Sequence, residues 1–137
     1  KRVAGLGRPV TAFLLDTNAF SMAITDDPRL PSKSRNRILT ATRIAVSAIT
    51  FYEIGQKVRL GKWPEMTCHV ETLDHQAIED GFEILPLTAS AASTAARLDW
   101  MHRNPFDRII AAVALEERLE LLSSDRAFDD IGVIRHW

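Results

Sequence analysis

The chain has 137 residues, of which 46% are hydrophobic and 26% charged, a composition that is ordinary for one folded domain. Its net charge of −1, from 17 basic and 18 acidic residues, neither demands nor excludes a polyanionic partner. No apolar run is long enough to cross a bilayer, so we expect no membrane partner. Cys68 is the only cysteine, which excludes an internal disulfide and fits a reducing, cytoplasmic location.

The first ten residues contain two glycines and three basic residues but no apolar stretch of the kind that a secretory signal needs. We expect residues 1–10 to be a lead outside the folded domain, either frayed or added to the natural chain. The domain is expected to span residues 11–137, since no linker or low-complexity stretch divides them.

Apolar stretches alternate with helical patterns along this domain. In chain order, we expect strands at residues 12–16, 43–47, 82–87, 121–123 and 132–134. We expect helices at residues 17–24, 34–42, 48–60, 67–80, 88–101 and 105–119. This alternation indicates an α/β fold with a parallel sheet that is covered by helices on both faces.

Four acidic residues lie where these strands end or where the next helix begins: Asp16, Glu53, Asp107 and Asp125. Because the carboxyl ends of parallel strands meet at one edge of a sheet, we expect the four side chains to converge there. Clustered carboxylates need a cation between them at neutral pH. Their hard oxygen ligands suit Mg²⁺ or Mn²⁺, so the pattern indicates a metal site.

Each acid also has a purely structural interpretation. Asp16 and Asp125 could cap a helix or turn, Thr50 and Glu53 have the spacing of a capping box, and Asp107 follows a helix start. Taken singly, capping is the more common role. Four such acids at one expected edge are more than the helices need, and together they favour the metal site.

Four stretches around these acids carry a family resemblance: residues 13–18 (FLLDTN), 46–54 (VSAITFYEI), 102–108 (HRNPFDR) and 121–128 (LLSSDRAF). In order and spacing they resemble the PIN-domain ribonucleases, specifically the VapC toxins of toxin–antitoxin pairs. The resemblance covers about residues 11–137. It implies a single PIN-like domain with a five-stranded parallel sheet in the order 3-2-1-4-5, flanked by helices.

The resemblance further implies a Mg²⁺- or Mn²⁺-dependent endoribonuclease that cleaves RNA phosphodiester bonds and acts as a toxin. Its catalytic, metal-binding acids map onto Asp16, Glu53, Asp107 and Asp125, and we expect Asp16 and Asp107 to be the principal direct ligands. The family also implies a cognate antitoxin protein that covers the site, and homodimers.

Further residues are expected around the metal ligands. Thr17, Asn18 and Ser123 are candidates for contacting the ligands, and Ser123 stands where many relatives have Thr. Arg103 and Arg108 are candidates for binding RNA phosphates, although Arg108 could instead pair with a site carboxylate. His102 could act as an acid or base, and Trp63 could stack on a base, but we expect a structural role for His102 and a core or partner-groove role for Trp63.

Two rival functions remain open at this stage. In a phosphotransferase or phosphatase, Asp16 would be a nucleophile, but such sites commonly have a second Asp two residues on, where this chain has Asn18. A non-catalytic PIN fold could instead serve as an RNA- or protein-binding module. A non-catalytic role would be favoured if some of the four acids were missing from the sequence, but all four are present.

Overall fold

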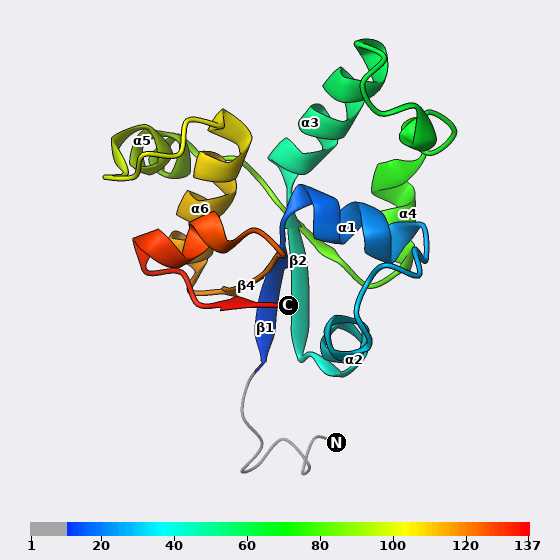
Figure 1. The fold of residues 1–137 in the computed structure, drawn as a ribbon, viewed down its shortest axis with the longest axis horizontal. Coiled ribbons are helices and arrows are strands. Elements are labelled where there is room, and N and C mark those ends of the chain that lie inside the picture. Colours follow the sequence, from blue (N-terminus) through cyan, green and yellow to red (C-terminus); the bar gives the residue numbers. More distant parts are fainter. Residues whose placement is uncertain (1–10) are drawn as a thin grey trace.

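The computed structural model describes residues 11–137, so the predicted lead lies outside the described residues. Five parallel strands form one sheet in the order β3-β2-β1-β4-β5, which confirms the predicted α/β topology. The strands, drawn in Figure 1, are β1 (Ala12–Leu15), β2 (Arg43–Ser47), β3 (Glu83–Leu85), β4 (Glu120–Leu122) and β5 (Arg135–His136).

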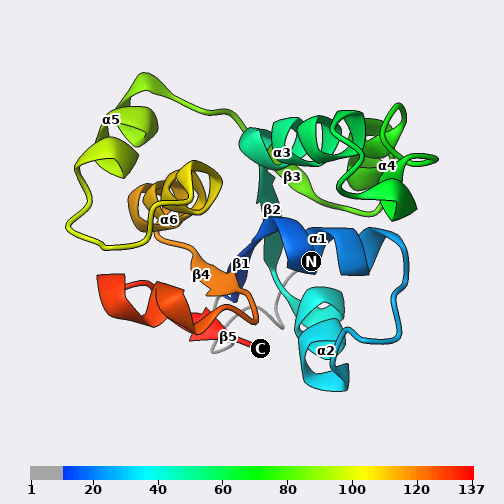
Figure 2. The same ribbon diagram turned by 45° about the horizontal axis from the view of Figure 1, so that its top comes forward.

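Helices cover both faces of this sheet (Figure 2). Those on one side are α1 (Thr17–Ile24), α2 (Ser32–Thr40), α3 (Ala48–Arg59) and α4 (Leu73–Glu79). Those on the other side are α5 (Ala89–Arg97) and α6 (Pro105–Glu117), together with the 3₁₀ helix η3 (Arg126–Ile131). A second 3₁₀ helix, η2 (Pro64–Met66), follows α3. Within the described residues, no helix is long and apolar enough to cross a membrane.

Two apolar clusters follow from this layering, because successive strand residues point to opposite faces. In β1, Leu14 belongs to the cluster beneath α5 and α6, whereas Phe13 and Leu15 belong to the cluster beneath α1, α3 and α4. Leu14 and Leu15 are fully buried. The central strand is therefore fixed from both sides, and so is the residue at which it ends.

The strand register brings the candidate site together. Leu15 is paired with Val46 of β2 and with Leu122 of β4. The backbone N–H of Asp16 donates to the carbonyl oxygen of Leu122 at 3.2 Å. The residues that leave these three strands therefore lie at one edge, and Asp16 lies beside Ser123.

Most predicted elements differ from the structure by a few residues at their ends, and three differ more. The helix expected at 67–80 is reduced to α4, because residues 67–72 offer no buried apolar stripe until Leu73 and Ala77. The helix expected at 88–101 ends at Arg97. The fifth strand lies after the predicted segment 132–134, since Gly132 has a φ of 81° and ends η3.

Candidate active site

Asp16 lies between β1 and α1 and is only 6% exposed. One carboxylate oxygen, Oδ1, accepts a hydrogen bond from the backbone N–H of Ala19 at 2.8 Å, so Asp16 is the N-cap of α1. The other oxygen, Oδ2, accepts from the hydroxyl of Ser123 at 2.5 Å. Asp16 therefore caps the helix with one oxygen while the other faces the residue that follows β4.

Burial raises the pKa of Asp16 to about 6, against the hydrogen bonds from Ser123 and Ala19, which lower it. The negative charges of Asp107 and Glu53 raise it further. Within the described residues, Asp16 forms no ion pair with a cationic side chain. Its raised pKa therefore marks a place where a cation would be bound favourably.

Glu53 lies on α3 and is only 4% exposed. Its Oε1 accepts from the hydroxyl of Thr17 at 2.6 Å, and its Oε2 accepts from Nζ of Lys57 at 2.7 Å. The oxygen of Thr17 is also 3.0 Å from the hydroxyl of Thr50. Because Thr17 has one proton and gives it to Glu53, Thr50 donates to Thr17. A chain of hydroxyls thus orients the Glu53 carboxylate.

The structural interpretation of Glu53 as part of a capping box is wrong. The N-cap of α3 is Ser47, whose hydroxyl oxygen accepts from the backbone N–H of Ile49 at 3.2 Å. Thr50 and Glu53 therefore lie inside the helix, where their side chains are free to face α1. Their buried polar groups bond to Thr17 rather than to the start of their own helix.

Asp107 lies in the first turn of α6, whose N-cap is Asn104. Its Oδ2 is 2.7 Å from Nε2 of His102. Burial raises the pKa of Asp107, the hydrogen bond with His102 lowers it, and the charges of Glu53 and Asp125 raise it. Asp107 therefore shares an electrostatic environment with the other acids.

Asp125 completes the group. It caps η3, because its Oδ1 accepts from the backbone N–H of Ala127 at 3.0 Å, and its own N–H donates to the hydroxyl oxygen of Ser123 at 3.0 Å. One ligand atom from each of His102, Asp107 and Asp125 lies within 4.8 Å of the others. Ser123 therefore links Asp16 to Asp125, as expected of a residue that contacts the site acids.

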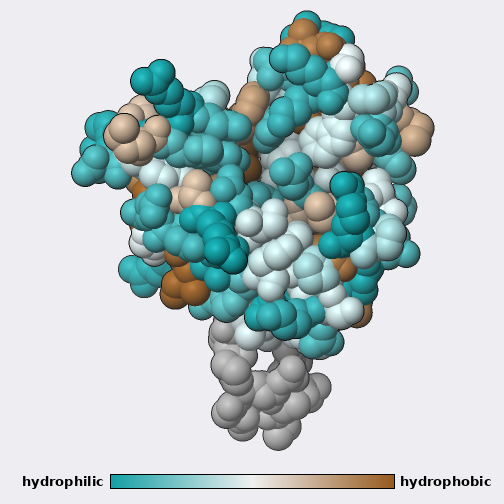
Figure 3. Space-filling view, viewed as in Figure 1, coloured by the Kyte–Doolittle hydropathy of each residue, from teal (hydrophilic) through white to brown (hydrophobic). Residues whose placement is uncertain are grey.

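The donor set fits a divalent cation. Asp107 and Asp125 lie in one close group with His102. Asp16, at the end of β1, and Glu53, within α3, act on Asp107 or on each other through their charges. Among the described residues, the cationic or titratable partners bonded to the four acids are Lys57 on Glu53 and His102 on Asp107. Carboxylate oxygens with a nearby imidazole suit Mg²⁺ or Mn²⁺, and the nitrogen favours the transition ion. Figure 3 shows the surface hollowed between α3 and the α5–α6 pair, above this edge.

The guanidinium of Arg108 is occupied by the backbone. It donates to five carbonyl oxygens, at 2.6–3.4 Å, of Ala95, Ala96, Leu98, Trp100 and His102. It forms no bond with a site carboxylate, and its donors are used within the fold. Arg108 therefore holds the α5–α6 connection, and we no longer assign it an RNA phosphate. The neighbouring Arg103 is exposed.

Thr17 bonds to a site acid, whereas Asn18 is exposed and lies at the rim of a neighbouring cavity. The sequence analysis missed the contacts of His102 and Lys57 with the site. Lys57 could have been found from its spacing, because Glu53 and Lys57 are four residues apart on one helix. His102 contacts Asp107 because the chain turns at Asn104 and Pro105. The spacing of apolar residues in the sequence does not indicate such a contact.

The fold and the site together are a parallel α/β sheet with a cluster of carboxylates at the carboxyl ends of its strands, which is the arrangement expected of a PIN domain. The PIN domain family matches residues 13–134, and the chain belongs to this family. No curated protein matches it in sequence.

Several solved structures share the fold. Rickettsia felis VapBC2, bound to a DNA fragment from its promoter, superposes with a TM-score of 0.65 at 20% identity, over 92% of this chain and 98% of that one. Neisseria gonorrhoeae FitAcB gives 0.64 at 22% identity, over 91% and 96%. Mycobacterium tuberculosis VapC20, described as a toxin that cleaves the sarcin–ricin loop, gives 0.61 at 18% identity, over 89% and 96%.

Proposed function

We propose that the chain is a divalent-metal-dependent endoribonuclease and the toxin of a toxin–antitoxin pair. The observation that carries this proposal is the gathering of Asp16, Glu53, Asp107 and Asp125 at one sheet edge, where the charges of neighbouring acids raise the pKa of Asp16 and of Asp107. The similarity in fold to VapC20, described as a toxin that cleaves the sarcin–ricin loop, and the resemblance of the four motifs to PIN-domain ribonucleases support RNA as the substrate.

A bound Mg²⁺ or Mn²⁺ would neutralise charge on the scissile phosphate and lower the pKa of a coordinated water. Asp16 and Asp107 would be its principal ligands, and Asp125 and Glu53 would bind it directly or hold its waters. Ser123 and the N–H of Ala19 fix both oxygens of Asp16. Glu53, whose carboxylate is oriented by Thr17 and Lys57, would assist proton transfer.

The RNA backbone needs cationic contacts near these acids, because four carboxylates would otherwise repel it. Arg103 is exposed and immediately precedes the N-cap of α6, close in sequence to Asp107. We therefore assign it a phosphate contact. Asn18 is exposed at the start of α1, so we assign it a contact with the RNA substrate rather than with the metal ligands.

The rival phosphotransferase, with Asp16 as its nucleophile, is disfavoured by Asn18, because such sites commonly have a second Asp at that position. The convergence of all four acids likewise argues against a module that only binds RNA or protein.

The test is cleavage of fluorescent RNA by purified protein with Mg²⁺, with Mn²⁺ and with chelator. Asp107→Asn removes an anionic oxygen without changing side-chain volume, so we expect cleavage to fall roughly a hundredfold or more while the circular dichroism is unchanged. Asp99→Asn neutralises an exposed acid before the same helix and is the matched control. Wild-type cleavage by folded Asp107→Asn would refute the proposal.

An antitoxin partner is part of this proposal, and it is supported by the fold similarity to toxin–antitoxin complexes such as that from Klebsiella pneumoniae. A cavity of about 230 Å³ beside α1 and α2 offers apolar side chains, among them Ala23, Ile38 and Leu39. Leu39 is 77% exposed. Phe20, also on α1, is fully buried and does not line this cavity.

We also propose a homodimer, as the family resemblance implies. Light scattering of the purified chain over a range of concentrations tests the dimer. Co-expression with the product of the adjacent gene tests the antitoxin. A chain that stays monomeric and binds no such product would refute both partner assignments without affecting the cleavage assay.

A further inference from the structure

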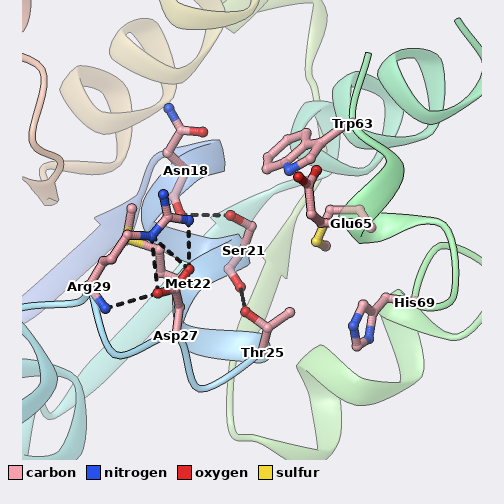
Figure 4. Close-up of a pocket in the computed structure, with 10 residues that line it drawn as sticks. Asn18, Ser21, Met22, Thr25, Asp27, Arg29, Trp63, Glu65 and His69 are labelled. Carbon is pink, nitrogen blue, oxygen red and sulfur yellow. Dashed lines mark hydrogen bonds and ion pairs between the residues drawn. The ribbon is translucent and has the colours of Figure 1, made fainter. Parts of the chain in front are cut away.

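A second cavity, of about 500 Å³, lies between α1 and the segment that follows α3 (Figure 4). It begins at Asn18, two residues after Asp16, and extends along α1 to Thr25. Its opposite wall includes Trp63, Glu65 and His69. A strand of RNA that crosses the acidic site would need only a few nucleotides to reach it.

The polar groups of this cavity divide into two kinds. Arg29 is closed onto Asp27 by an ion pair of 2.7 Å, and the hydroxyls of Ser21 and Thr25 donate to carbonyl oxygens of α1. Four polar side chains of the cavity, by contrast, form no hydrogen bond with another group of residues 11–137: those of Asn18, Trp63, Glu65 and His69. The cavity therefore presents an amide, an indole, a carboxylate and an imidazole whose hydrogen-bonding capacity is available to a ligand.

Trp63 supplies a flat wall. Its side chain packs against the apolar cluster beneath α1, α3 and α4 and projects toward α1 (Figure 4). Nζ of Lys57 lies 5.6 Å from the centre of its ring and also bonds to Glu53. The ring is thus joined through one side chain to the candidate active site.

We infer that this cavity binds an unpaired guanine base of the RNA substrate, stacked on Trp63 and hydrogen-bonded to Glu65. The inference rests on the proposed function and adds to it a determinant of sequence preference. Sequence-specific RNA recognition commonly uses unstacked bases, which stack on aromatic side chains and bond through their Watson–Crick edge.

The chemistry of a carboxylate selects guanine among the four bases. An ionised carboxylate only accepts hydrogen bonds, through two oxygens. Guanine alone offers two adjacent donors, N1–H and the 2-amino group, on its Watson–Crick edge. Adenine and cytosine place an acceptor beside their amino group, and uracil places its single N–H between two carbonyls, so each would set a lone pair against Glu65.

The charge of Arg29, which is paired with Asp27, also acts on Glu65 across the cavity. Hydrogen bonds from Arg29 to Asp27 are the largest cause of the raised pKa of Arg29, and the charge of Glu65 adds a smaller effect. Arg29 and Glu65 therefore act on the same space. The guanidinium can attract a phosphate while Glu65 bonds to the base.

The test measures binding of the complete chain, without metal, to short oligouridines with one central guanine, inosine or adenine. Inosine keeps N1–H but lacks the 2-amino group. We expect wild type to bind the guanine RNA on the order of tenfold more tightly than the inosine RNA. Glu65→Gln, which keeps the shape but not the second acceptor, should remove this preference. Glu71→Gln, an exposed acid outside the cavity, should keep it.

Trp63→Leu tests the stacking wall and should weaken binding of all three RNAs on the order of tenfold, with a circular dichroism spectrum like that of wild type. Equal affinity of wild type for guanine and inosine, or a preference that survives Glu65→Gln, would overturn the inference. RNA affinity unchanged by both Glu65→Gln and Trp63→Leu would also overturn it and leave the cavity to a protein partner.

The same oligonucleotides, incubated with Mn²⁺, separate this inference from the proposed function. RNA that is cut equally well with guanine, inosine or adenine would refute the guanine site and keep the endoribonuclease. RNA that is bound with a guanine preference but never cut would refute the endoribonuclease and keep the guanine site.

Discussion

The Thr17 hydroxyl illustrates how single groups hold the acids in place. It is buried and lies between two polar side chains of α3, donating to Glu53 at 2.6 Å and accepting from Thr50 at 3.0 Å. Buried polar groups that lose such a partner cost free energy, because no water replaces it. Thr17 therefore serves both the stability of the α1–α3 contact and the orientation of Glu53.

Thr17→Val keeps the shape of the side chain and removes both hydrogen bonds. We expect the free energy of unfolding, measured by urea denaturation, to fall by about 1–3 kcal/mol, and RNA cleavage to fall as well. Thr17→Ser keeps the hydroxyl and should recover most of both. Thr67→Val, at an exposed position, is the control. If Thr17→Val were as stable and active as wild type, the hydroxyl chain would have no role.

The sequence was sufficient to bring the four acids near the strand ends, because the elements that carry them have local patterns. Asp16 and Asp125 cap the helices after β1 and β4, and Glu53 and Asp107 lie within α3 and α6. It was not sufficient to assign their partners. His102 meets Asp107 across a turn, and Ser123 meets Asp16 although the two are 107 residues apart. Such contacts depend on the strand register and on loop shape, which the local pattern of apolar residues does not determine.

At the scale of elements, Arg108 fixes the connection between α5 and α6. This connection has no regular structure between residues 98 and 104, so its carbonyl oxygens lack helical partners. The guanidinium replaces those partners with five bonds to the backbone. One of the carbonyls is that of His102, whose side chain bonds to Asp107, so the same side chain positions the rim of the site.

Arg108→Gln should lower the free energy of unfolding by about 2–4 kcal/mol, because several charge-assisted bonds to partly buried carbonyls are lost. Arg103→Gln, five residues earlier and exposed, should change stability by less than about 0.5 kcal/mol. It should instead weaken RNA binding and reduce the salt dependence of affinity. Urea denaturation and binding titrations at several salt concentrations compare the two. If Arg103→Gln lowered the stability and Arg108→Gln changed only RNA binding, both assigned roles would be contradicted.

The elements that the sequence predicted best are those with local signals. The bounds of α1 and β2 agree with the prediction, since Asp16 and Ser47 cap the helices that follow β1 and β2. β5 has only two residues, and they form a strand because they pair with Leu121 and Leu122. A strand that exists through pairing alone has little signature in its own sequence.

For the whole molecule, the clustered acids make stability depend on pH. The pKa of Asp16 is raised to about 6 in the folded protein, above its ordinary value, so the folded state binds more protons than the unfolded state over this interval. Asp16 therefore contributes its full stabilisation of the folded protein below its unfolded pKa. This contribution is lost as the pH rises through about 6. Burial raises the pKa of Asp107 in the same direction.

We therefore expect the metal-free protein to lose stability between about pH 4 and pH 6. A shift from the ordinary pKa to about 6 corresponds to about 3 kcal/mol from Asp16 alone. Other groups titrate in the same range, so the measured quantity is the difference between wild type and Asp16→Asn. Asn can still accept the bond from Ala19 and still meet Ser123, but it has no charge to desolvate.

Urea denaturation at each pH, with chelator or with Mn²⁺, gives this difference. Without metal, the stability of wild type relative to Asp16→Asn should decrease as the pH rises. Mn²⁺ at neutral pH should stabilise wild type in a concentration-dependent way and Asp16→Asn much less, because metal bound only by the folded state shifts the folding equilibrium. Asp130→Asn, at an exposed position, should follow wild type throughout. A metal-free Asp16→Asn protein that is less stable than wild type at neutral pH, with no stabilisation of wild type by Mn²⁺, would show that Asp16 serves only as a helix cap.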